Sequence, residues 1–126
     1  GKHIPLYCTA VGKVFLAYSN LLNFDSWYEE EKMSIIKLTT KTITERLVLE
    51  KVVKEVKELG YAVDDEENEY NIFCVSAPIV DHLQNVKYAI SVSSPKFRTE
   101  DRDLHQFIES IRHTANAISE EIGGNF

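Results

Sequence analysis

Long apolar runs are missing from this chain of 126 residues, of which 44% are hydrophobic and 27% charged. No segment approaches the roughly 20 consecutive apolar residues of a membrane span. The first residues, GKHIPLYCTAVGK, also lack the apolar core of a signal peptide. With only three prolines and five glycines, the composition is not that of a disordered or fibrous chain. We therefore expect one globular, cytoplasmic domain, or most of one.

Cysteine and clustered basic residues are scarce as well. Cys8 and Cys74 are too few for a disulfide scaffold, and neither they nor the four histidines follow the spacing of metal ligands. We expect reduced thiols, no metal site and no cofactor. The 14 Lys and Arg against 20 Asp and Glu give a net charge of -6. This balance argues against direct contact with nucleic acid, because binding to phosphates needs clustered basic side chains.

Helical spacing of apolar residues is what the sequence has in abundance. The predicted helices span Thr9–Tyr18, Ser26–Lys32, Glu45–Leu59 and Glu100–Ile122. Thr9 and Thr44 are the expected N-caps of the first and third of these, and Gly60 and Gly123 the expected stops of the last two. The segment MSIIKLTTKTIT, after the second helix, is expected to be extended or irregular.

Three strand patterns lie between the last two helices. They are Tyr61–Val63, Asn71–Val80 and Val86–Ser94. The polar loop DHLQN between the last two predicts an antiparallel hairpin in which Cys74 lies opposite Ser93 and Ser76 opposite Ser91. These four side chains share a small, weakly polar face with Ile72, since side chains alternate along a strand. The opposite face carries the alternate, apolar residues of the two strands and should pack against the long helices. These residues are Phe73, Val75, Ala77, Ile79, Tyr88, Ile90 and Val92. The predicted fold class is α+β, an antiparallel sheet flanked by helices.

Four blocks of the sequence follow one another in a characteristic order. They are IPLYCTAVGKVFLAY, TITERLVLEKVVKEVKELGYAVDDEEN, IFCVSAPIVD and AISVSSPKFR. Together they resemble the effector-binding domain of the IclR family of bacterial transcriptional regulators. Such regulators join an N-terminal winged helix-turn-helix to a GAF-like C-terminal domain. The resemblance implies that residues 1–126 are a partial effector-binding domain, without the DNA-binding domain and without the first strands of the sheet.

The resemblance also implies a function, partners and a site. The domain would sense a small organic acid and alter a homodimer or tetramer, which contacts DNA only through the absent winged helix-turn-helix. The implied effector-binding positions are Ile4, Ala10, Val11, Asp64, Ile72, Cys74, Ser91 and Ser93. In this interpretation the serine hydroxyls and the free amides at the start of the first helix bind the carboxylate. Ile72 and Cys74 form an apolar floor, Ile4 forms a wall, and Asp64 meets a hydroxyl or carries a raised pKa.

The same residues also have purely structural explanations. Strand serines are usually satisfied by backbone or water, and a buried cysteine is usually a small hydrophobe. Lys13 would face solvent, and the acidic residues from Asp65 to Glu69 would form a solvated turn. Asn71 and Ser94 replace glycines common in the family, and asparagine tolerates the left-handed conformation.

Two other functions fit the sequence. One is an enzyme with Cys74 as nucleophile and a histidine or Asp64 as base. The other is a structural oligomerisation domain that pairs through the long terminal helix. No Ser-His-Asp or Cys-His arrangement stands out, so we expect a sensor that is not an enzyme.

Overall fold

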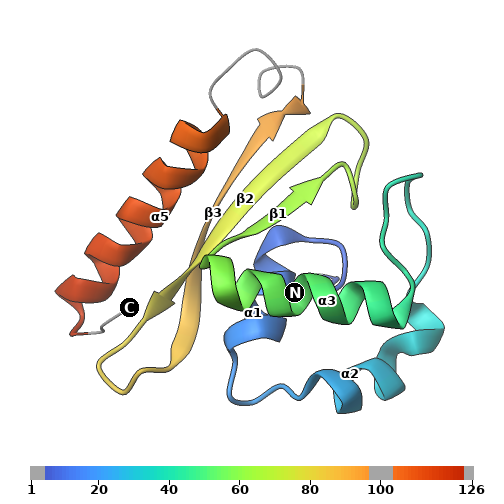
Figure 1. The fold of residues 1–126 in the computed structure, drawn as a ribbon, viewed down its shortest axis with the longest axis horizontal. Helices are drawn as coiled ribbons and strands as arrows, with labels where there is room; N and C mark the ends of the chain where they lie inside the picture. Colours follow the sequence, from blue (N-terminus) through green and yellow to red (C-terminus); the bar gives the residue numbers. More distant parts are fainter. Residues whose placement is uncertain (1–4, 97–103, 124–126) are drawn as a thin grey trace.

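A three-stranded antiparallel sheet with helices on both faces forms the centre of the computed structural model, which describes residues 5–96 and 104–123 (Figure 1). The helices are α1 (Ala10–Tyr18), α2 (Phe24–Glu31), the short 3-10 helix η1 (Lys32–Ser34), α3 (Arg46–Leu59) and α5 (Leu104–Glu121). The strands are β1 (Ala62–Asp65), β2 (Ile72–Val80) and β3 (Val86–Pro95), in the order β1-β2-β3. The predicted α+β class is confirmed.

The register of the sheet brings the small polar residues into rows. Cys74 pairs with Ser93 and Ser76 with Ser91, as predicted from the hairpin loop. The strand β1 adds Asp64 opposite Cys74. Because directly opposed residues in an antiparallel sheet share a face, Asp64, Cys74 and Ser93 form one row across all three strands.

The helix α5 packs against the apolar face of the sheet, as expected. Alternate residues of β2 from Phe73 to Ile79 are buried with Ile108, Ile111 and Ala115 of α5. The buried Ser119 fixes the end of this contact, since its hydroxyl accepts a hydrogen bond from the Val80 amide at 2.9 Å. Tyr88, predicted to belong to the packed face, is instead 63% exposed, because α5 follows β2 more closely than the edge strand β3.

The helices α1 and α3 form the layer on the other face (Figure 1). Ala10 and Val14 of α1 pack against Ala62, Val80 and Val86 of the sheet. Leu49 and Val53 of α3 join a neighbouring cluster that contains Cys8, Leu16 and Trp27. The α1 layer therefore covers the Ser76 end of the weakly polar face, where Ser76 is fully buried.

The predicted helix ends are mostly right. Thr9 caps α1, and Gly60 and Gly123 follow α3 and α5 with φ angles of 81° and 86°. Thr44 is wrong as a cap, because Glu45 occupies the N-cap position of α3 and makes no side-chain capping bond. Asn71, in the place of a family glycine, has a φ of 67°. Among the described residues, no helix is both long enough and apolar enough to cross a membrane.

Candidate functional site

The entry to α1 is a tight turn. The Thr9 hydroxyl accepts a hydrogen bond from the Gly12 amide at 3.1 Å and donates one to the Pro5 carbonyl at 2.6 Å. A Cβ atom on Gly12 would lie 2.4 Å from the Leu6 Cα atom and 2.7 Å from its carbonyl oxygen. Glycine is therefore required here because the chain before the helix lies directly against it.

The helix start provides the amides that the sequence analysis assigned to an effector. Ala10 and Val11 follow the N-cap, so neither amide has an intrahelical partner. Ala10, however, is only 2% exposed and belongs to the core cluster under α1. The expectation that the backbone at Ala10 is accessible is therefore wrong for this arrangement, whereas Val11 is half-buried. An effector contact at either amide stays a prediction.

Cys74, in the middle of the row of Asp64, Cys74 and Ser93, packs against the core cluster that contains Ala10. The Cys74 sulfur and the Ser93 hydroxyl are 3.0 Å apart, and Ser91 and Ser93 are both exposed. The Ser76 hydroxyl donates to the Ile90 carbonyl at 3.0 Å. Two hydroxyls of this face are thus available to a ligand, while the third is already satisfied by the backbone.

Asp64 is buried, with 3% of its surface exposed. One carboxylate oxygen, Oδ1, accepts hydrogen bonds from the amides of Glu67 at 2.8 Å and Asn68 at 3.4 Å, which closes the turn after β1. Burial raises the pKa of Asp64, and these two hydrogen bonds partly oppose that shift. The raised pKa agrees with one of the two expectations for Asp64, while its contact with a ligand stays a prediction.

A buried ion pair supports this turn, and sequence reasoning missed it. Lys13 is 2% exposed, and its ammonium group donates to both carboxylate oxygens of Glu67, at 2.5 and 2.7 Å, and to the Val63 carbonyl at 2.8 Å. The expectation that Lys13 faces solvent is wrong, as is that of a solvated Glu67, which is 6% exposed. Lys13 is the one charged residue in an otherwise apolar helix, AVGKVFLAY. A single lysine in an apolar helix was the feature of the sequence that could have indicated a buried, paired Lys13.

Two buried threonines also hold the acidic turn. The Thr39 hydroxyl donates to the Glu66 carbonyl at 2.5 Å, and the Thr42 hydroxyl donates to the Glu67 carbonyl at 2.6 Å. The loop that was predicted to be irregular is therefore fixed to the turn that carries Asp64. Glu67 contacts α1 through its carboxylate, the end of β1 through its amide and this loop through its carbonyl.

Both cysteine thiols lie near Asp64 and are not activated. Burial and, to a smaller extent, the negative charge of Asp64 raise the pKa of Cys8 to about 11. Burial also raises the pKa of Cys74, while the hydrogen bond with Ser93 lowers it. Reactive thiols have a depressed pKa. Within the described residues, no group of three or more His, Cys, Asp or Glu side chains is arranged to hold a metal ion.

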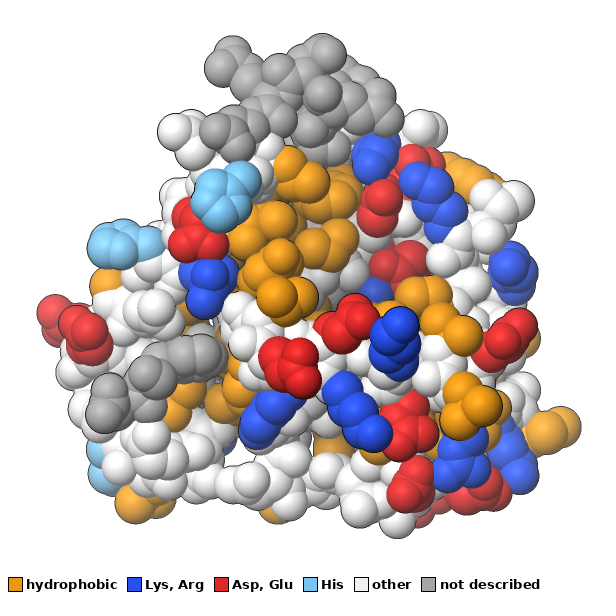
Figure 2. All heavy atoms as spheres, viewed as in Figure 1, with side chains coloured by type: hydrophobic (Ala, Val, Ile, Leu, Met, Phe, Trp, Pro, Cys, Tyr) orange, Lys and Arg blue, Asp and Glu red, His pale blue; other side chains and the backbone are white. Residues whose placement is uncertain are grey.

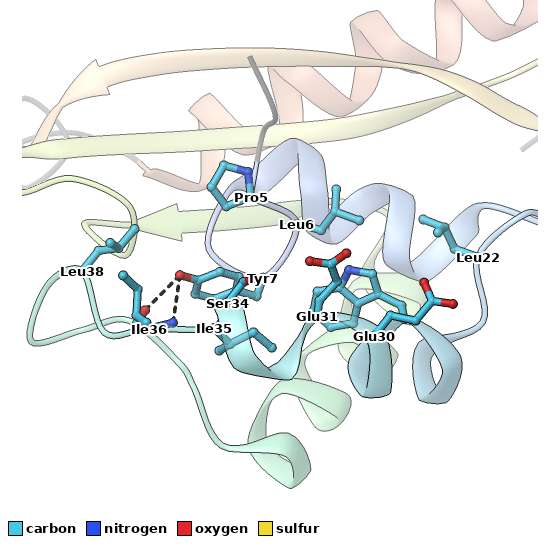
Figure 3. A pocket seen from close by; sticks show the side chains of 11 residues that line it. Pro5, Leu6, Tyr7, Leu22, Glu30, Glu31, Ser34, Ile35, Ile36 and Leu38 are labelled. Atoms are coloured by element: carbon cyan, nitrogen blue, oxygen red, sulfur yellow. Dashed lines mark hydrogen bonds between the residues drawn. The ribbon is translucent and has the colours of Figure 1, made fainter. Parts of the chain in front are cut away.

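A separate pocket lies between the α1 entry, α2 and the following loop (Figure 3). It has a volume of about 820 Å³ and is lined mainly by apolar side chains, among them Leu6, Trp27 and Ile35, with Glu30 and Glu31 as its charged members. The Tyr7 hydroxyl fixes one wall by donating to the Ile36 carbonyl at 2.9 Å. The described residues of the lining include two carboxylates and no basic side chain, and such a lining does not suit an anion.

The structure brings together only some of the predicted site residues. Asp64, Cys74 and Ser93 share a row, Ser91 lies on the same face in the next row, and the half-buried Ile72 continues this face. Ile4 lies outside the described residues.

Figure 2 shows acidic and basic side chains interleaved over α2 and α3 on the face in view. One of these pairs joins Arg46 of α3 to Asp25 of α2 at 2.8 Å.

Comparison with known proteins identifies the family of this chain. The family described as "Bacterial transcriptional regulator IclR C-terminal" matches residues 1–120. The chain belongs to the IclR family. The resemblance noted in the sequence is therefore confirmed, and the domain is the C-terminal domain of an IclR-family transcriptional regulator.

Individual IclR-family proteins agree with this assignment. An "Uncharacterized HTH-type transcriptional regulator" of Haemophilus influenzae is 40% identical over 124 residues, which cover 98% of this chain and 46% of the relative. The "DNA-binding transcriptional repressor YiaJ" of Escherichia coli is 36% identical over 98% of this chain and 44% of its own length. The chain thus spans less than half the length of these curated relatives. Their names are those of regulators, which agrees with the expectation that the domain is not an enzyme.

A solved structure shows the same fold. "The crystal structure of transcriptional regulator YaiJ" superposes with a TM-score of 0.89 at 36% identity, over 98% of this chain and 68% of that one. The chain therefore has the IclR C-terminal fold.

Proposed function

We propose that this chain is the effector-sensing part of a longer, cytoplasmic IclR-type regulator, and that it binds a small organic acid on the face shared by Asp64, Cys74, Ser91 and Ser93. The observation that supports this proposal most is the row of Asp64, Cys74 and Ser93, in which Cys74 packs against the core cluster that contains Ala10 of α1. Ser91 and Ser93 present two exposed hydroxyls on this face, and hydroxyls and the amides of a helix start are groups that bind carboxylates.

Each residue of the site has a separate role in this proposal. The hydroxyls of Ser91 and Ser93 donate to the carboxylate of the acid, and the amides of Ala10 and Val11 add donors at the positive end of the helix dipole. Ile72 and Cys74 contact the carbon skeleton, and the family resemblance adds Ile4 to the proposed contacts. Asp64 either binds a hydroxyl of the acid or meets its carboxylate with a raised pKa.

The site is open on the side of β3 in the described part of the chain. Ser91 and Ser93 lie exposed on an edge strand, and an edge strand presents unpaired backbone groups. Additional strands, which the family resemblance implies, would pair with this edge and enclose the effector. A change in the α1 entry on binding would expose the Ala10 amide.

Binding regulates transcription only if the acid prefers one arrangement of the oligomer, because equal affinity for two states shifts nothing. The arrangement is a homodimer or tetramer, and DNA is contacted by a winged helix-turn-helix elsewhere in the protein. A coupling free energy of about 1 to 3 kcal/mol is typical for such regulation. The rival of a Cys74-dependent enzyme is disfavoured because burial raises the pKa of the Cys74 thiol.

The test is a calorimetric titration of the full-length regulator with pyruvate, glyoxylate, gluconate and benzoate. The double variant Ser91→Ala, Ser93→Ala should weaken the binding of the tightest acid by tenfold or more, since each hydrogen bond to a charged group contributes about 1.5 to 3 kcal/mol. Ser94→Ala is the matched control, because Ser94 pairs with Phe73 in the adjacent row and faces away. Equal affinity of the double variant and the control would remove the serines from the site.

A further inference from the structure

We propose that Asp64 takes up one proton when the carboxylate of an effector binds, so that Asp64 meets the anion as a neutral hydrogen-bond donor. This inference depends on the function proposed above and adds a proton to its binding reaction. The reactants are the effector anion, the Asp64 carboxylate and one proton from the buffer, and the product is a complex with a single negative charge shared between the two carboxyl groups.

The hydrogen bonds of Asp64 leave one atom for that proton. Oδ1 already accepts two hydrogen bonds, from the amides of Glu67 and Asn68. The other oxygen, Oδ2, makes no hydrogen bond to any residue in the described part of the chain. A proton on Oδ2 would therefore leave the turn intact and provide a donor on the face that carries Cys74 and Ser93.

Lys13 is not available to neutralise an incoming anion. An ammonium group has three donors, and those of Lys13 are used by the Val63 carbonyl and the two Glu67 oxygens. Both Lys13 and Glu67 are almost fully buried, with 2% and 6% of their surface exposed. The charge of Lys13 is therefore shared with Glu67, and none of its three donors is left for Asp64 or for an effector.

Among the described residues, the other ionisable groups around Asp64 do not supply a positive charge that could offset an incoming anion. They are Cys8 before α1, Lys13 on α1, Asp65 on β1, Glu67 in the turn, and Cys74 on β2 with Glu69 near it. The pKa values of both thiols are raised, so the thiols are neutral near pH 7. Lys96 and Lys41 pair with Asp65. In the described part of the chain, the lysines near Asp64 and Asp65 that could meet an anion are already paired, so an effector would bring a further negative charge to a buried carboxylate, and protonation removes that repulsion.

Calorimetry measures the proton directly. The full-length regulator is titrated with the tightest-binding acid of the four named above, at about pH 7.5, in phosphate and in Tris. These buffers differ in ionisation enthalpy, so the difference in apparent binding enthalpy gives the number of protons taken up. We expect an uptake that approaches one proton per site. The affinity should fall by up to about tenfold per pH unit wherever the free protein has Asp64 ionised.

Two variants identify the group. Asp64→Asn is neutral at every pH and keeps an acceptor for the turn, so it should bind without proton uptake and with a flat pH dependence. Asp81→Asn is the matched control, since Asp81 Oδ1 also accepts two turn amides, those of Leu83 and Asn85 at 2.9 Å, but lies in the β2–β3 loop. It should keep the uptake of the unchanged protein.

The outcomes separate the two proposals. Binding without proton uptake in the unchanged protein overturns this inference and leaves the proposed function standing. The same holds if Asp64→Asn binds with undiminished uptake, because another group then carries the proton. If none of the four acids binds to a regulator that folds and binds its operator, the proposed function fails, and this inference fails with it.

Discussion

Replacing Lys13 by methionine should be among the most damaging single changes in this domain. Lys13→Met keeps most of the volume and the apolar stem of the side chain, but it removes the ammonium group. The carboxylate of Glu67, 6% exposed, would then be left in the interior with the Asp65 amide at 3.3 Å as its remaining partner. Breaking a buried ion pair from one side costs about 3 to 5 kcal/mol, chiefly because an uncompensated charge remains.

That loss is large compared with the stability of a small domain. The free energy of unfolding is about 5 to 15 kcal/mol for most domains, so Lys13→Met should lower Tm by roughly 10 to 20 °C. Urea unfolding of residues 1–126, followed by far-UV circular dichroism and extrapolated linearly, measures the change. Lys41→Met is the matched control. Lys41 pairs with Asp65 and Glu66 at the surface, where ion pairs contribute little.

The pH dependence of the variant identifies the cause. Burial already raises the pKa of Glu67, and Lys13 opposes that shift. Without Lys13 the folded-state pKa rises further. A carboxyl group whose folded-state pKa is raised stabilises the protein below its unfolded-state pKa, and this contribution is lost as the pH rises through the folded-state value. The deficit of Lys13→Met should therefore be largest near neutral pH and shrink toward about pH 5.

A double variant tests whether the loss of stability comes from the unpaired charge of Glu67. Lys13→Met combined with Glu67→Leu removes both charges and should recover much of the lost stability, because apolar replacement of a complete buried pair is often neutral or better. A single variant that loses less than about 1 kcal/mol, or a double variant less stable than the single one, would contradict a buried Lys13–Glu67 pair.

Two other predictions concern the α1 entry and the thiols. Gly12→Ala should destabilise the domain by about 1 to 3 kcal/mol in the same urea titration, because the new methyl group would meet the backbone of Leu6; an unchanged midpoint would mean that the α1 entry is not packed as described. Cys74 should react with iodoacetamide at neutral pH more slowly than free cysteine, since burial raises its pKa, and Cys8, with a pKa of about 11, more slowly still. Rapid alkylation of Cys74 would revive the enzyme alternative.

Local signals in the sequence were sufficient for the hairpin and the helix ends. A symmetric polar loop determines which residues of two strands are opposed, so the pairs Cys74–Ser93 and Ser76–Ser91 could be predicted. The helix stops at Gly60 and Gly123 follow from the left-handed conformation that glycine adopts easily. The same reasoning applied to Asn71, whose φ is positive as expected.

Local sequence signals could not predict contacts between charged residues that are far apart in the chain. Lys13 and Glu67 are separated by 54 residues in the chain, and charged residues are almost never fully buried unless paired. Without the partner in view, solvent exposure was the better expectation for both. The burial of Ala10 has a similar origin, since it depends on how α1 lies across the sheet. The pocket beside Trp27 could not be predicted either, because it forms where α2 and an irregular loop meet the α1 entry.

A crystal structure of the full-length regulator with its tightest-binding acid tests the proposed sensing site most directly. We predict that the carboxylate of the acid lies within hydrogen-bond distance of the hydroxyls of Ser91 and Ser93, with its carbon skeleton against Cys74. An acid bound instead in the pocket lined by Trp27 and Glu30, with the Ser91 and Ser93 hydroxyls free of it, would contradict the proposal.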